Sequence, residues 1–189
     1  PRDILQLAGH LDLDGFALAA PSATDHTWYP HSFLAPEEEN QPGLDSALSL
    51  IHGIFAKLEQ AGIRLEHTYV LGFSQGACLA LEAVARRPAR YGGVFALSGG
   101  LIGLGVNRRT FSGDLAGTPV VMGCSDVDPH IPRERFDASA RVLREMGADV
   151  RDTLYPGFGH TVNQHELDQI QHVLHPPLHS TPTPKEIQP

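Results

Sequence analysis

The sequence predicts a single α/β domain built on a mostly parallel sheet, and three observations support this. Short apolar runs of strand length alternate with amphipathic segments of ten or more residues, the pattern of right-handed βαβ units. A chain of 189 residues is long enough to bury a core without disulfides or a metal. Hydrophobic residues make up 41% and charged residues 19% of the chain, which disfavours a disordered chain or a coiled coil.

The first part of the chain is predicted to hold two helices, one strand and a long loop. Apolar residues at helical spacing predict a helix over 3–12. Residues 15–20 read as a buried strand, and the proline-containing segment 22–43 reads as a loop. Steps of three and four between apolar residues predict a second helix over 44–61.

The remaining elements are assigned in the same way. Strands are predicted at 67–73, 92–97, 118–123 and 150–155, and helices at 75–87, 133–146 and 163–174. In right-handed βαβ units, the helices that connect successive parallel strands cover both faces of the sheet. Prolines crowd the end of the chain, so we expect a folded domain over 1–175 and a disordered tail over 176–189.

Charge and cysteine content narrow the function classes. Lys plus Arg total 14 against 22 for Asp plus Glu, a formal net charge of −8, which disfavours a nucleic-acid or anionic-membrane partner. Cys78 and Cys124 show neither CxxC nor zinc spacing, so redox chemistry is not predicted. Neither a membrane span nor a signal peptide is recognisable, and we expect a cytoplasmic protein.

The strongest local signal is a GxSxG motif between a predicted strand and a predicted helix. Residues 70–77 read Val-Leu-Gly-Phe-Ser-Gln-Gly-Ala. A sharp strand-to-helix turn strains its central residue, so its neighbours at Gly72 and Gly76 are expected to need small side chains. Ser74 would then project at the N-terminal end of a helix, whose dipole favours developing negative charge. A glycine-rich turn with a capping serine is the simpler alternative.

Two later loops supply the partners that a serine nucleophile needs. An imidazole must remove the hydroxyl proton, and a carboxylate must orient that imidazole. Residues 124–132 follow a predicted strand and contain Asp126 and Asp128, while His160 lies in a glycine-containing loop after the next strand. The order serine, acid, histidine along the chain therefore suits a catalytic triad at the carboxyl ends of three strands.

On these residues the sequence resembles the phospholipase/carboxylesterase family of α/β-hydrolases, which includes bacterial serine esterases and acyl-protein thioesterases. The matching stretches are 27–30, 32–36, 72–76, 128–132 and 155–160. The resemblance implies Ser74 as nucleophile, His160 as general base and then acid, and a loop aspartate as orienting acid. Asp128, followed by Pro129 and by a second proline, fits the family pattern better than Asp126, which stays the alternative.

The sequence departs from the family before the first predicted helix. Family members carry an earlier strand and a His-Gly loop whose backbone N–H forms half of the oxyanion hole, and this sequence shows no such segment. The main-chain N–H of Gln75 is the remaining donor, and loss of one donor costs roughly 10² to 10³ in kcat. We therefore expect either a fragment of a longer hydrolase or an impaired one.

The resemblance implies cleavage of small ester or thioester substrates through an acyl-serine intermediate, without a cofactor, by a monomer or homodimer. Loop placement makes Trp28, Tyr29, Phe33 and Leu101 the expected walls of an apolar acyl pocket. The C-terminal histidines fit no zinc signature, so no metal site is predicted. The alternative is a non-catalytic binding or scaffold protein that keeps the turn at Ser74 without a complete oxyanion hole.

Overall fold

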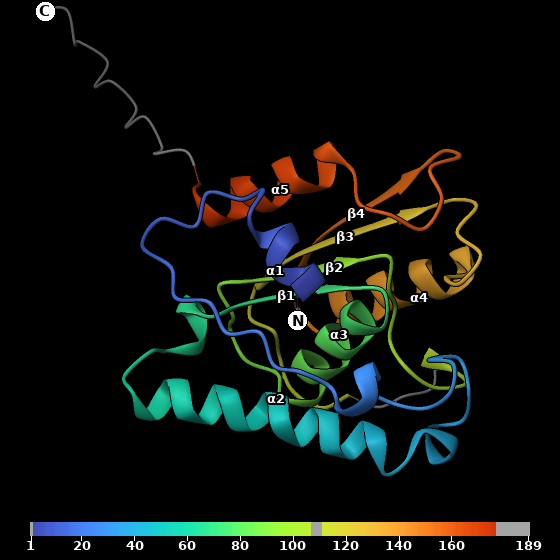
Figure 1. Cartoon of the computed structure of the whole chain (residues 1–189), viewed down its shortest axis with the longest axis horizontal. Coiled ribbons are helices and arrows are strands. Elements are labelled where there is room, and N and C mark those ends of the chain that lie inside the picture. The colour runs from blue at the N-terminus through green and yellow to red at the C-terminus, as the bar shows by residue number, and fades with distance from the viewer. Residues whose placement is uncertain (1, 107–110, 177–189) are drawn as a thin grey trace, which may run out of the picture.

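Four parallel strands form one sheet between two layers of helices in the computed structural model, which describes residues 2–106 and 111–176 (Figure 1). The strands lie in the order of the chain: β1 (Tyr69–Phe73), β2 (Gly93–Leu97), β3 (Pro119–Ser125) and β4 (Asp149–Tyr155). Helix α3 (Gln75–Arg86) connects β1 to β2, and α4 (Arg133–Glu145) connects β3 to β4. The predicted α/β class is confirmed.

Alternation of side chains along the strands divides the core into two parts. Val94, Ala96, Val120 and Met122 face a large cluster that includes residues of α3, of α4 and of α2 (Gly43–Gln60), and α2 packs against α3. Their neighbours Phe95, Leu97 and Val121 face the opposite way, toward Ile170 and Leu174 of α5 (Gln164–Leu174). In Figure 1, α2 and α5 accordingly lie on opposite sides of the sheet.

The later helices begin and end within two residues of the predicted bounds. An asparagine and a glutamate form a reciprocal capping box that starts α5: Asn163 accepts the N–H of Glu166, whose carboxylate accepts the N–H of Asn163. Within the described residues, three short 3-10 helices accompany these elements: η1 (Thr24–His26), η2 (Glu37–Asn40) and η3 (Leu65–His67). In the described part of the chain, no helix is long and apolar enough to span a membrane. Nearly all of the predicted tail, 177–189, lies outside the described residues.

The N-terminal region differs from the prediction. Helix α1 (Arg2–Ala8) is shorter than expected, and residues 15–20 form no strand; Leu18 within them is 58% exposed. An extended segment needs a neighbouring strand to satisfy its backbone and cover its side chains. Here a mostly apolar groove of about 1250 Å³ separates residues 15–20 from β1, the edge strand of the sheet.

Candidate active site

Ser74 occupies the tight turn between β1 and α3. Its backbone has φ 55° and ψ −122°, a strained conformation for a residue with a side chain. The turn is anchored on both sides, because the N–H of Ser74 donates to the carbonyl of Leu97 and its carbonyl accepts the N–H groups of Ala77 and Cys78. The hydroxyl is therefore fixed at the carboxyl end of β1 and the N-terminus of α3.

The two glycines of the motif are not equivalent. A Cβ on Gly72 would overlap the carbonyl of Gly76, because the first turn of α3 folds directly over the end of β1. A Cβ on Gly76 would meet nothing within 4 Å, because this residue borders the groove beside β1. The expectation that both positions need small side chains is therefore correct at Gly72 and wrong at Gly76.

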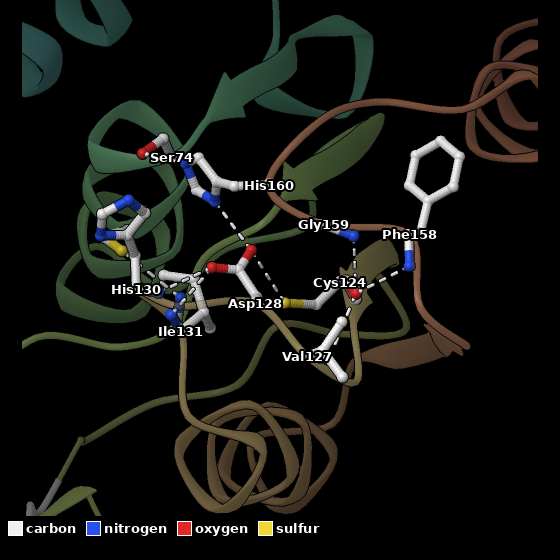
Figure 2. Close-up of polar contacts among 12 residues, drawn as sticks. Ser74, Cys124, Val127, Asp128, His130, Ile131, Phe158, Gly159 and His160 are labelled. Atoms are coloured by element: carbon white, nitrogen blue, oxygen red, sulfur yellow. Dashed lines mark hydrogen bonds and ion pairs between the residues drawn. The ribbon is translucent and has the colours of Figure 1, made fainter.

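The structure brings Ser74, His160 and Asp128 together from three separate loops. Nε2 of His160 lies 2.8 Å from Oγ of Ser74, and Nδ1 lies 2.7 Å from Oδ2 of Asp128. Figure 2 shows the imidazole between the hydroxyl and the carboxylate. The ring is packed against Phe73, with ring centroids 5.0 Å apart, and against His130, at 4.8 Å. One imidazole therefore bridges an alcohol and an acid in a fixed orientation.

The carboxylate of Asp128 is buried and hydrogen-bonded at both oxygens. Oδ1 accepts the N–H groups of His130 at 2.8 Å and Ile131 at 3.2 Å, while Oδ2 accepts from His160 and from the Cys124 thiol at 3.7 Å. Burial alone would raise the pKa of Asp128, but the hydrogen bonds from His160 and the two backbone N–H groups outweigh it and lower that pKa. Asp128 is therefore held as the anion at neutral pH.

Asp126, the alternative acid, has a different position. Its Oδ1 accepts the N–H of Gly157 at 2.7 Å, so it holds the loop that carries His160 and makes no hydrogen bond with the imidazole. Ser125 supports the same loop: its Oγ accepts the N–H groups of Phe158 at 3.2 Å and Gly159 at 3.0 Å. Ser125 was not among the residues predicted from the sequence, although its place at the end of a strand beside an acidic loop was a signal.

Gln75 begins α3 immediately after Ser74. Main-chain N–H groups in the first turn of a helix have no acceptor within the helix, so the N–H of Gln75 is available to a group bound at Ser74. The side-chain amide of Gln75 is hydrogen-bonded to residues 27–29.

Among the described residues, no group of three His, Cys, Asp or Glu side chains could hold a metal ion.

A pocket of about 240 Å³ lies beside Ser74. Its lining residues are Tyr29, His31, Ser32, Phe33, Ser74, Gln75, Cys78, His130 and Ile131. The phenol of Tyr29 faces the Cys78 thiol, and burial raises the pKa of both groups, to about 12 for Cys78. The thiol is therefore neutral and is no competing nucleophile at neutral pH.

The structure places the four residues expected to line the acyl pocket in three different surroundings. Tyr29 and Phe33 line the small pocket, and Trp28 lines the larger groove beside β1. Leu101 is completely buried and lines neither, so that expectation is wrong. Its N–H donates to Oγ of Ser139 and its carbonyl accepts from Arg135, and these bonds to α4 hold Leu101 in the core.

Comparison with known proteins gives consistent matches over most of the chain. A family model for phospholipases and carboxylesterases matches residues 19–176. Acyl-protein thioesterase 1 of Gibberella zeae is 31% identical over 142 residues, and a probable carboxylesterase of Arabidopsis thaliana is 28% identical over 156 residues. These matches cover 72% and 82% of this chain but only 59% of each relative.

Solved structures agree with these matches. The crystal structure of a phospholipase/carboxylesterase from Dyadobacter fermentans is 43% identical and superposes with a TM-score of 0.89, covering 92% of this chain and 84% of that chain. Esterase PE8 is 25% identical, with a TM-score of 0.71 over 92% of this chain and 85% of its own.

Proposed function

Because the chain belongs to the phospholipase/carboxylesterase family, we propose that it is a serine hydrolase that cleaves carboxylic esters or thioesters through an acyl-serine intermediate. The observation that carries the proposal is the pair of hydrogen bonds that joins the hydroxyl of Ser74 to the carboxylate of Asp128 through His160. The relatives named as carboxylesterase and acyl-protein thioesterase support both substrate classes.

In the acylation half-reaction, Oγ of Ser74 attacks the acyl carbonyl while Nε2 of His160 takes the hydroxyl proton. The ionised Asp128 stabilises the imidazolium that forms and holds Nδ1 protonated. The main-chain N–H of Gln75 and the N-terminal end of α3 stabilise the oxyanion of the tetrahedral intermediate. Collapse of the intermediate breaks the bond to the leaving alcohol or thiol, which takes the proton from Nε2.

In the deacylation half-reaction, water replaces the leaving group. Nε2 of His160 takes a proton from water, the resulting hydroxide attacks the acyl-serine carbonyl, and the proton passes to Oγ of Ser74 as the carboxylic acid departs. This step restores the hydroxyl of Ser74 and the neutral imidazole of His160, which still carries its proton on Nδ1.

One observation favours a second candidate, a binding or scaffold protein with weak or no turnover. Among the described residues we identify only the N–H of Gln75 as an oxyanion donor beside Ser74, and absence of a second donor costs roughly 10² to 10³ in kcat. The chain spans 59% of the length of the two curated relatives. A donor from polypeptide outside this sequence would restore that factor.

A fluorophosphonate probe separates the two candidates, because it reacts with an activated serine and needs no turnover. We expect one probe per chain in the wild type and none in S74A, together with hydrolysis of short aryl esters or thioesters by the wild type alone. A wild type that folds and takes up no probe would exclude the hydrolase and favour the binding protein.

A further inference from the structure

The side chain of Gln75 ties the first residue of α3 to the loop 27–29. Its Oε1 accepts the backbone N–H of Trp28 at 2.9 Å, and its Nε2 donates to the carbonyl of Tyr29 at 2.9 Å and to Oγ1 of Thr27 at 3.2 Å. An N–H can only donate and a carbonyl can only accept, so these partners fix which way the amide points. The hydroxyl of Thr27 in turn donates to the carbonyl of Tyr29 at 2.9 Å.

The loop that Gln75 holds continues into one wall of the pocket beside Ser74. Tyr29 and Phe33 belong to that wall, and so do the two residues next to Phe33 on its N-terminal side. A volume of about 240 Å³ has room for on the order of eight water molecules at about 30 Å³ each. This pocket suits a short acyl chain, and the position of its wall limits the length that it accepts; the larger groove beside β1 also reaches Ser74 and Gln75 but is not lined by Tyr29 or Phe33.

Other hydrogen bonds hold the loop from elsewhere. The buried Asn40 accepts the N–H of His31 at 2.8 Å and donates to the carbonyl of Ser32 at 3.0 Å, and the N–H of Gly103 donates to the carbonyl of Phe33 at 2.7 Å. None of these bonds involves the turn at Ser74. Among the described hydrogen bonds of residues 27–33, those to Gln75 are the ones that reach that turn.

We propose that the Gln75 side chain is a positioning and specificity-determining residue, which sets the distance between Ser74 and the pocket wall and so the acyl length that the enzyme prefers. This inference rests on the proposed function. The main-chain N–H of the same residue faces the oxyanion, so one residue aligns both the reacting carbonyl and the wall that receives its acyl chain. A displacement of about 1 Å at such a site can cost about 10²-fold in rate.

Two substitutions remove the side-chain bonds to different degrees and keep the main-chain N–H. The methionine of Q75M is similar in length to glutamine but makes none of the side-chain hydrogen bonds of Gln75. The carboxylate of Q75E can still accept the N–H of Trp28 but cannot donate to the carbonyl of Tyr29. Q164M is the matched control, because Gln164 is exposed on α5 and bonds only to the side chain of Asp168 among its described hydrogen bonds. Thermal melting establishes that each variant folds.

The first readout needs no catalysis. Trp28 is the single tryptophan of the chain, so quenching of its fluorescence by acrylamide reports the mobility of the loop directly. We expect the quenching constant to rise at least about twofold in Q75M and less in Q75E, and to stay at the wild-type value in Q164M. An unchanged constant in a folded Q75M would overturn the proposal.

The second readout is kcat/KM over aryl esters with acyl chains of two to eight carbons. The wild type and Q164M should prefer the short chains, and Q75M should lower the short-to-long ratio at least about fivefold. An unaltered ratio in a Q75M with raised quenching would show a merely structural side chain and would refute the specificity role. A wild type without turnover on any ester, but with the expected quenching changes, would instead overturn the proposed function and the specificity role with it.

A variant that fails to fold does not end the test. T27V removes the hydroxyl that bonds to both Gln75 and Tyr29, and it offers the same two readouts with a smaller perturbation. The double variant with Q75E should change the acyl-length ratio by less than the two single effects combined, because both act on one network. Fully additive effects would contradict a shared role.

Discussion

Glu166 offers a sharp test of how burial controls the stability of this fold. Glu166 lies in the first turn of α5, and its side chain is 1% exposed. Its Oε1 packs against Gly123 of β3 so closely that a Cβ at Gly123 would overlap it. Burial raises the pKa of Glu166 from its ordinary 4.5 to about 7, although the N–H of Asn163 donates to its other oxygen and opposes the rise. The folded protein therefore binds this proton more tightly than the unfolded chain does.

The sign and size of the effect follow from this difference. The stabilisation is fully present below about pH 4.5 and is lost as the pH rises through about 7, because the charged carboxylate is then confined in the core. The difference in pKa corresponds to about 3 kcal/mol. Cys124 and Tyr155 also face this group, but burial raises both their pKa values, that of Cys124 to about 12, so neither titrates in this range.

E166Q removes the titration and keeps an oxygen to accept from the N–H of Asn163. Urea unfolding at pH 4.5, 6, 7 and 8 should show the free energy of unfolding of the wild type falling, relative to E166Q, by about 3 kcal/mol across the series. E38Q, which removes an exposed carboxylate, controls for net charge. Parallel curves for the wild type and E166Q would show that the pKa of Glu166 is not raised in the folded protein.

Two further comparisons use matched residues. D128N should lower kcat for ester hydrolysis by about 10⁴, since the imidazole loses its orienting anion. D126N keeps an acceptor for the N–H of Gly157, and its kcat should stay within about tenfold of the wild type. Equal losses of kcat in the two variants would contradict the assignment of Asp128. In denaturant unfolding, G72A should lower the free energy of unfolding by more than about 3 kcal/mol, because the added Cβ overlaps the carbonyl of Gly76. G76A should lower it by less than about 1 kcal/mol, because its Cβ meets nothing within 4 Å. Similar losses in the two variants would contradict the geometry of the turn.

The sequence predicted well those features that depend on local pattern. The helices of the βαβ units follow from apolar periodicity and the strands from short apolar runs, because each element buries one face or both against its immediate neighbours. Ser74, the aspartate loop and His160 were identifiable because each follows a strand, and parallel strands end at the same edge of a sheet.

Features that depend on distant partners were predicted poorly. Residues 15–20 have the composition of a strand, but a strand exists only where a neighbour pairs with it, and none among the described residues does. Leu101 was placed in the pocket from its loop position, whereas its direction is set by bonds to Ser139 and Arg135 far along the chain. Ser125 was missed for the same reason, since its value lies in backbone groups that the fold brings to it.

The covalent species that forms when the protein meets an activated ester shows directly which residue is the nucleophile. Rapid mixing with an aryl acetate, acid quenching and peptide mass mapping should find one acetyl group per chain on Ser74 at early times, and none in S74A or H160A. An acetyl group on another residue such as Cys78, or no adduct while the ester is consumed, would contradict an imidazole-activated Ser74.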